Sequence, residues 1–260
     1  MEYSERISFI QKDPWFQEHI ARYHKLSEYK LGFHVLDIAC GSGYGTKYIS
    51  ELGCRTIGMD QSSSTVEANK KTFKENSNLT FQVGNAEQIA LPHNSFSSVI
   101  SFETIEHLAN PEDFLSEVRR VLKPTGLFFI STPNALITKP FEGIPLNPYH
   151  VKEYTPQELQ EILSKYFEVN SIFGQVVSPE FKLNYFWNPD SSRFLSPKYY
   201  LWSILNRMSK FAPKSADQIC RFILKSPLYP DSASWIFTET FVDSAHDLFV
   251  ICTKKADMNC

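Results

Sequence analysis

Short apolar runs alternate with amphipathic stretches over the middle of the chain. In the stretches between these runs, at residues 44–52, 63–74 and 111–122, apolar positions recur at helical spacing. Alternation of strands and helices is typical of βαβ units built around a parallel sheet. The predicted strands are residues 33–39, 55–60, 79–83, 96–102, 126–131 and 248–252.

Changes in composition divide the chain into four predicted parts. Residues 1–30 carry aromatic side chains at helical spacing, which predicts an N-terminal helical cap. Residues 31–177 hold the alternating strands and helices of a cofactor-binding core. Residues 178–240 contain six prolines and aromatic-rich helical pieces, so we expect a helical insertion that forms a lid over an acceptor pocket. Residues 241–260 hold the last strand and a tail.

Composition excludes several classes of protein. Apolar residues make up 42% and charged residues 21%, which is typical of a globular chain. The net charge of −3 argues against a nucleic-acid partner. No apolar run approaches the roughly 20 residues of a membrane-spanning helix. The five cysteines are irregularly spaced, so they indicate neither a disulfide framework nor a zinc site, and we expect a cytoplasmic location.

The most informative motif follows the first predicted strand, where Asp37 precedes a turn containing Gly41 and Gly43. Glycines let a ligand approach the backbone, and the next helix begins at this turn. A dinucleotide site requires a third glycine, but Thr46 occupies that position. An acid beside this turn suits a cofactor with a positive centre better than a pyrophosphate. The next strand also ends in an acid, Asp60.

With these motifs in this order, the chain resembles the class I S-adenosylmethionine-dependent methyltransferases of type 11 over roughly residues 33–170. The resemblance implies a Rossmann-like α/β fold with a mostly parallel seven-stranded sheet flanked by helices. It also implies that Asp60 accepts hydrogen bonds from the ribose hydroxyls. Asn85, where many members have Asp, is a departure from the family pattern. The positions that the resemblance assigns to the cofactor are Arg22, Tyr23, Asp37, Ala39, Gly41, Gly43, Asp60, Gln61, Asn85, Ala86, Glu87 and Phe102.

A second group of polar residues follows the fourth predicted strand as the motif E-x-x-E-H. If this turn is helical, Glu103, Glu106 and His107 lie on one face, and His150 in the later Asn-Pro-Tyr-His loop can complete the group. Carboxylates and imidazoles together suit Mg²⁺ or Mn²⁺. The motif resembles metal-dependent O-methyltransferases that act on small-RNA 3′ ends or ubiquinone precursors. The alternative is a capped turn without metal.

Three functions remain open from the sequence. The first is methyl transfer to a hydroxyl of a small polar acceptor, such as a sugar, a glycan or a vicinal diol, with Glu103, His107 and His150 as catalytic residues. The Asn-Pro-Tyr-His loop also resembles that of glycan and deoxysugar methyltransferases. The second is methylation of an RNA ribose, which the net charge disfavours. The third is a binding module without catalysis, which the intact Asp37 and Asp60 disfavour. Oligomeric state is not indicated.

Overall fold

A computed structural model of the chain describes residues 14–178, 197–225 and 227–255. The described residues form two compact units. Residues 22–175 and 237–255 belong to the first, whereas residues 14–21, 176–178, 197–225 and 227–236 belong to the second. Predictions for residues 1–13, 179–196 and 256–260 lie outside the described part of the chain.

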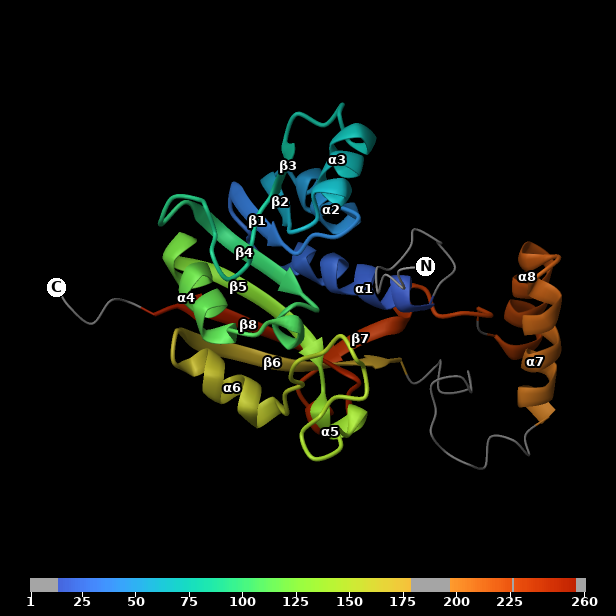
Figure 1. The fold of residues 1–260 in the computed structure, drawn as a ribbon. Coiled ribbons are helices and arrows are strands. Elements are labelled where there is room, and N and C mark those ends of the chain that lie inside the picture. Colours follow the sequence, from blue (N-terminus) through green and yellow to red (C-terminus); the bar gives the residue numbers. More distant parts are fainter. Residues whose placement is uncertain (1–13, 179–196, 226, 256–260) are drawn as a thin grey trace. The chain divides into compact units, whose positions relative to one another are not determined.

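The sheet is mixed and has eight strands in the order β3-β2-β1-β4-β5-β8-β6-β7, as Figure 1 shows. Strand β1 pairs in parallel with β2 and β4, whereas β8 is antiparallel to β5 and β6. The prediction of a mostly parallel, seven-stranded sheet is therefore confirmed only in part: β3, β2, β1, β4 and β5 are parallel, but the sheet is mixed and has eight strands among the described residues. The strands are β1 (His34–Ile38), β2 (Arg55–Asp60), β3 (Leu79–Val83), β4 (Phe96–Phe102), β5 (Leu122–Pro133), β6 (Phe167–Val177), β7 (Trp235–Thr238) and β8 (Asp247–Lys254).

The helices predicted at residues 44–52, 63–74 and 111–122 begin at the predicted residues. Thr155 caps a further helix in a reciprocal capping box with Glu158. Asn110 precedes a helix with proline at its first position but forms no side-chain cap. The helices are α1 (Pro14–Lys25), α2 (Tyr44–Glu51), α3 (Ser63–Thr72), α4 (Pro111–Val121), α5 (Ala135–Thr138), α6 (Pro156–Ser164), α7 (Pro197–Ser209) and α8 (Pro213–Leu224), with short 3₁₀ turns η1 (Leu26–Glu28), η2 (Ile105–His107), η5 (Ser232–Ser234) and η6 (Val242–Ser244).

The two faces of strand β1 pack against different helices. Leu36 and Ile38 are buried in the main core with residues of α4 and α6. The intervening residue, Asp37, points to the opposite face and bonds Thr46 of α2, because successive strand residues alternate between faces. The carboxyl ends of β1, β2 and β4 meet at one edge of the sheet, where ligands of open α/β folds bind.

In the second unit, α7 and α8 form a helical hairpin with its own small core of buried side chains. The Trp202 indole donates a hydrogen bond to the Leu228 carbonyl at 3.0 Å, which ties α7 to the segment after α8. Helices were predicted here, although the same segment also contains the short strand β7. The lid role stays a prediction. Among the described residues, no helix is long and apolar enough to cross a membrane.

Candidate active site

The turn after β1 is held in a conformation that favours glycine. Gly41 and Gly43 have φ values of +51° and +75°, and Ala39 also has a positive φ, of +57°. A Cβ on Gly43 would lie 2.8 Å from the Phe81 ring, so packing requires glycine there. A Cβ on Gly41 would meet no atom within 4 Å. The backbone at Gly41 therefore faces open space that a ligand can occupy.

Asp60, at the end of β2, connects this turn to the next strand. Its Oδ2 accepts a hydrogen bond from the Gly41 amide at 3.0 Å, and its Oδ1 accepts one from the Ser62 amide at 2.9 Å. A carboxylate offers about four acceptor positions, so these two bonds fix the side chain and leave capacity for ligand hydroxyls. The neighbouring Gln61 is exposed. The predicted cofactor residues Gly41 and Asp60 are thus in direct contact.

Asp37 is fully buried below the turn. It accepts hydrogen bonds from the Thr46 hydroxyl at 2.6 Å and from the Tyr23 hydroxyl at 3.2 Å. Burial raises the pKa of Asp37 to about 7, although the two hydroxyls oppose this shift. The Tyr23 ring fits because residue 45 is glycine, where a Cβ would lie 2.0 Å from it. The Tyr23 hydroxyl therefore contacts Asp37, so its predicted place at the cofactor's carboxylate remains untested.

The residues assigned to the adenine side are partly engaged with the protein itself. The exposed Asn85 accepts a hydrogen bond from the Glu87 amide at 2.9 Å. The Glu87 carboxylate accepts one from the Asn110 amide at 2.7 Å, and Ala86 packs against the main core. The buried Phe102 ring lies 4.9 Å from the Tyr23 ring, centroid to centroid. The binding of the cofactor by these residues stays a prediction.

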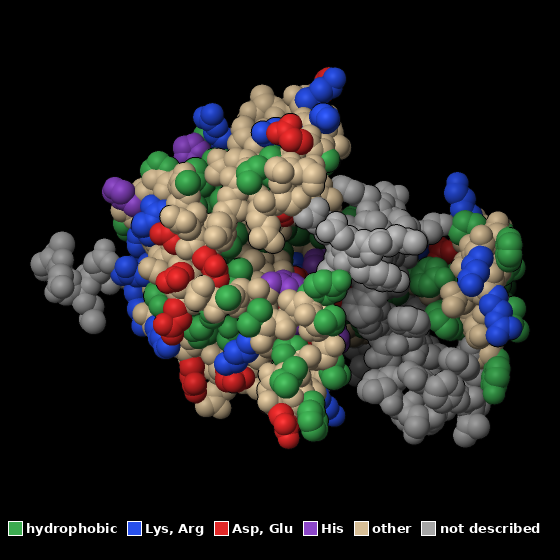
Figure 2. All heavy atoms as spheres, in the orientation of Figure 1, with side chains coloured by type: hydrophobic (Ala, Val, Ile, Leu, Met, Phe, Trp, Pro, Cys, Tyr) green, Lys and Arg blue, Asp and Glu red, His purple; other side chains and the backbone are tan. Residues whose placement is uncertain are grey.

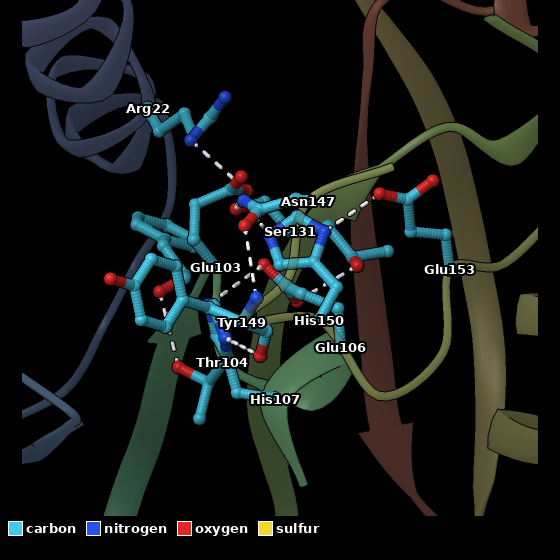
Figure 3. Close-up of polar contacts among 12 residues, drawn as sticks. Arg22, Glu103, Thr104, Glu106, His107, Ser131, Asn147, Tyr149, His150 and Glu153 are labelled. Carbon is cyan, nitrogen blue, oxygen red and sulfur yellow. Dashed lines mark hydrogen bonds and ion pairs between the residues drawn. The ribbon is translucent and has the colours of Figure 1, made fainter. Parts of the chain in front are cut away.

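Arg22 is almost completely buried, with 1% of its side chain exposed, and its guanidinium binds protein groups (Figure 3). It lies 3.1 Å from a Glu103 oxygen and 3.0 Å from an Asp247 oxygen, and its Nε donates to Gln175 at 2.6 Å. The resemblance had placed Arg22 among the cofactor residues, whereas these contacts join Arg22 to three distant parts of the chain. Sequence reasoning missed Asp247 and Gln175, since no local motif marks them.

Glu103 departs from the predicted helical turn. Its φ is +50°, which is uncommon for a residue with a side chain, and such conformations cluster at functional sites. The Ser131 hydroxyl donates to the Glu103 carboxylate at 2.7 Å, and Arg22 pairs with the same oxygen. Burial raises the pKa of Glu103, with Arg22 opposing the shift. Glu103 therefore belongs with Arg22 and Ser131.

The other three predicted ligands do come together. Glu106, His107 and His150 offer ligand atoms that all lie within 4.8 Å of one another. The Thr132 hydroxyl donates to Glu106 Oε2 at 2.9 Å. The buried Oε1 forms no hydrogen bond with any described residue and lies 3.8 Å from His107 Nε2. Burial, and then the charge of Glu103, raise the pKa of Glu106 well above its usual range. This arrangement can hold a proton or a cation.

Hydrogen bonds fix the tautomers of both histidines (Figure 3). His107 Nδ1 lies 3.0 Å from the Tyr149 carbonyl oxygen, which can only accept a hydrogen bond. In the neutral ring Nδ1 therefore carries the proton and Nε2 carries the lone pair. Asn147 Oδ1 accepts from the Tyr149 amide, so its Nδ2 donates to His150 Nε2 at 2.9 Å. His150 therefore carries its proton on Nδ1.

Glu153 is a site residue that sequence reasoning missed. It is buried, and one of its carboxylate oxygens accepts the His150 Nδ1 proton at 2.7 Å. The other oxygen accepts a hydrogen bond from the Thr138 hydroxyl. An acid three residues after a histidine was the available signal, and it is a weak one. The pairing orients the His150 ring and fixes its tautomer.

Comparisons with known proteins give the class of this domain. Residues 36–130 match the family described as "Methyltransferase domain". Over 165 residues the chain is 36% identical to a protein of Mycolicibacterium smegmatis named "Probable S-adenosylmethionine-dependent methyltransferase", which covers 63% of each chain. This chain thus spans less than two thirds of that relative. It is also 28% identical over 170 residues to a "Ubiquinone biosynthesis O-methyltransferase" of Bartonella bacilliformis, covering 60% of this chain and 67% of that protein.

A solved structure supports the fold. The PH0226 protein from Pyrococcus horikoshii OT3 superposes with a TM-score of 0.53 at 24% identity, covering 64% of this chain and 90% of that one. Identity this low supports the fold alone, since one fold hosts many functions. The match over residues 36–130 includes Asp37, Gly41, Gly43 and Asp60. Residues 36–130 therefore resemble a methyltransferase domain, and the superposition supports a Rossmann-like fold.

Proposed function

We propose that this protein is an S-adenosylmethionine-dependent methyltransferase that acts on a hydroxyl of a small polar acceptor. The observation that carries the proposal is the contact between Asp60 and the Gly41 amide, at a turn whose backbone faces open space. The fixed carboxylate can accept hydrogen bonds from a ribose, and the accessible turn at the start of a helix can bind a neighbouring charged group.

The residues at this edge fit the cofactor by their chemistry. When bound, S-adenosylmethionine supplies an electrophilic methyl group on a positively charged sulfur. Asp60 would accept hydrogen bonds from the ribose hydroxyls, and the Gly41 turn would lie against the amino-acid part. The buried Asp37 provides negative charge near this turn, which a positive ligand would favour.

The acceptor hydroxyl would lie at Glu106, His107 and His150. His150 Nε2 is unprotonated, because Glu153 holds the proton on Nδ1. A hydroxyl that replaced the Asn147 amide would therefore meet a base ready to take its proton as the new C–O bond forms. In this proposal His150 is the catalytic base and Glu153 is a positioning residue. The chain otherwise acts by aligning the reactants and excluding water.

We also propose that Mg²⁺ or Mn²⁺ can bind at Glu106, His107 and His150. Support comes from Glu106 Oε1, a buried carboxylate oxygen that forms no hydrogen bond. Glu103 is not part of this smaller set, and His150 Nε2 would have to release Asn147 to coordinate the cation. His150 would then be a metal ligand and not the base, so the metal route is an alternative to base catalysis by His150. A bound cation would supply Lewis acidity, which lowers the pKa of an acceptor hydroxyl. Without it, the raised pKa of Glu106 favours its protonated form.

For the acceptor, we propose a sugar or another vicinal diol. Two neighbouring hydroxyls suit a site that presents a carboxylate and two imidazoles. The Bartonella relative is named as a ubiquinone-biosynthesis O-methyltransferase, which is consistent with transfer to an oxygen. RNA is disfavoured because the chain has a net charge of −3 and RNA binding depends on neutralising phosphates.

Cofactor binding is tested by calorimetric titration of S-adenosylmethionine into the wild type, Asp60→Ala, and the exposed control Asp113→Ala. Each charge-assisted bond lost should cost about 1.5–3 kcal/mol, so Asp60→Ala should raise Kd at least about tenfold. The control should match the wild type. Equal affinity for wild type and Asp60→Ala would refute the cofactor site.

The reaction is tested by measuring methyl transfer to nucleotide sugars, glycans, catechols and single-stranded RNA, with EDTA and with added Mn²⁺. Transfer to a diol that is lost in EDTA and restored by Mn²⁺ supports the metal site. Transfer that EDTA leaves intact excludes a role for the metal and supports His150 as the base. Glu106→Gln should abolish Mn²⁺ binding, measured by electron paramagnetic resonance. Cofactor binding without transfer to any hydroxyl acceptor would favour the binding module.

A further inference from the structure

The outer surface of the α7–α8 hairpin is apolar to an unusual degree. The inner surfaces of the two helices already pack together, through Trp202 and Leu205 of α7 and Ala216 and Cys220 of α8. Other large apolar side chains of the hairpin are left in solvent. Phe211 is 92% exposed and Phe222 is 77% exposed, and the exposed side chains also include Ile204, Ile219 and Ile223. Exposed apolar groups at this density indicate an interaction surface.

The same hairpin is basic, although the whole chain has a net charge of −3. Residues 200–225 contain five cations and one acid, Asp217. The cations are Arg207, Lys210, Lys214, Arg221 and Lys225, all of them exposed. Figure 2 shows hydrophobic and basic side chains together on the surface of this hairpin. Positive charge is therefore concentrated where the apolar side chains are exposed.

The two kinds of side chain form neighbouring stripes on α8. Lys214 and Arg221 are seven residues apart and share one side of the helix, and Lys225 follows directly at its C-terminal end. Phe222 and Ile223 lie three and four residues after Ile219, so these three side chains share the adjacent side of the helix. The buried Ala216 and Cys220 face α7. The helix thus has one packed side, one apolar exposed side and one basic exposed side, which is the pattern of helices that lie in a membrane interface.

We propose that the outer face of the α7–α8 hairpin binds the surface of an anionic lipid bilayer. Phe211, Phe222 and Ile223 would insert among the acyl chains near the headgroups, and Lys214, Arg221 and Lys225 would contact the lipid phosphates. Charge complementarity favours this partner over a second copy of the chain, since two such basic faces would repel each other. Nucleic acid would pair with the cations but would leave the aliphatic side chains exposed to water. The proposal does not depend on the methyl transfer reaction.

The test is co-sedimentation of the full chain with vesicles of phosphatidylcholine alone and of phosphatidylcholine with phosphatidylglycerol. We expect binding only to the anionic vesicles, and weakening at high salt. Each cation near an anionic surface contributes about fivefold, so Arg221→Glu with Lys225→Glu should weaken binding by at least about 25-fold. Phe222→Ser with Ile223→Ser keeps the charge and should weaken binding about tenfold or more.

A matched charge control is Lys71→Glu with Lys74→Glu, which changes the net charge equally at exposed positions of the first unit. It should bind vesicles almost as the wild type does. Unchanged circular dichroism and unchanged S-adenosylmethionine affinity would show that the hairpin variants are folded. The proposal is overturned if anionic vesicles do not bind the wild type, or if the control loses as much binding as the hairpin variants. A dimer in sedimentation velocity that Phe222→Ser with Ile223→Ser dissociates, without vesicle binding, would assign the surface to a second copy instead.

Discussion

Replacing Asp37 with asparagine should change how stability depends on pH. Asp37 is buried between the Thr46 and Tyr23 hydroxyls, and its pKa is raised from 3.8 to about 7. Asparagine has nearly the same shape and can both donate and accept hydrogen bonds, so it keeps the packing while removing the titration.

The sign follows from proton linkage. The folded chain binds the Asp37 proton more tightly than the unfolded chain does, so this group stabilises the fold most below about pH 4. That contribution is lost as pH rises to about 7, at about 1.4 kcal/mol per pH unit. The full difference is about 4 kcal/mol. The free energy of unfolding of Asp37→Asn should therefore rise relative to the wild type between about pH 4 and pH 7, and then level off.

The measurement is urea denaturation of the wild type, Asp37→Asn and the exposed control Asp113→Asn, without cofactor, at about pH 5, 6, 7 and 8. The difference between Asp113→Asn and the wild type should stay constant. Because a positive ligand favours ionised Asp37, wild-type affinity for S-adenosylmethionine should also weaken below about pH 7, whereas the affinity of Asp37→Asn should stay more nearly constant. A stability difference between Asp37→Asn and wild type that does not vary with pH would refute the argument.

Three further predictions follow from packing and pairing. Gly43→Ala should lower the free energy of unfolding in urea by about 2–4 kcal/mol, because the new Cβ would strike Phe81. In the control Gly53→Ala the new Cβ meets open space, so backbone strain should lower the free energy of unfolding by only about 1–2 kcal/mol. Arg22→Met should cost about 3–5 kcal/mol because it leaves buried carboxylates unpaired, whereas the exposed control Arg221→Met should cost under about 1 kcal/mol. Glu153→Gln should lower kcat about tenfold to hundredfold without changing S-adenosylmethionine affinity, and an unchanged kcat would contradict its positioning role.

The parts of the fold that depend on local pattern could be predicted from the sequence. Strands β1 to β4 and helices α2 to α4 begin and end within a few residues of their predicted bounds. The strand order at the far edge could not, because pairing between β8 and β5 is decided by tertiary contacts. Strand β7 was missed because Trp235–Thr238 is only 4 residues long and lies in a segment rich in proline.

The same distinction applies to the site. The turn at Gly41 and Gly43 could be predicted because backbone geometry of this kind follows from residue type and spacing, and Asp60 does contact this turn. Their role in binding the cofactor stays a prediction. The partners of Arg22 could not be found this way. Gln175 is 153 residues away in the chain, so only the folded sheet brings the two side chains together. Long-range polar pairs of this kind leave no periodic signal in a single sequence.

The E-x-x-E-H motif shows how one backbone angle changes a predicted site. Placing Glu103, Glu106 and His107 on one face assumed helical dihedrals throughout, but helical geometry begins only at Ile105. With φ at +50°, Glu103 leaves the turn and pairs with Arg22. If both carboxylates faced the same cation site, their repulsion would need a metal for balance. In the observed arrangement Arg22 neutralises Glu103, and Glu106 can remain protonated because its pKa is raised. We therefore expect the fold to be stable with or without a cation, so that the chelation experiment can distinguish the two mechanisms in a folded protein.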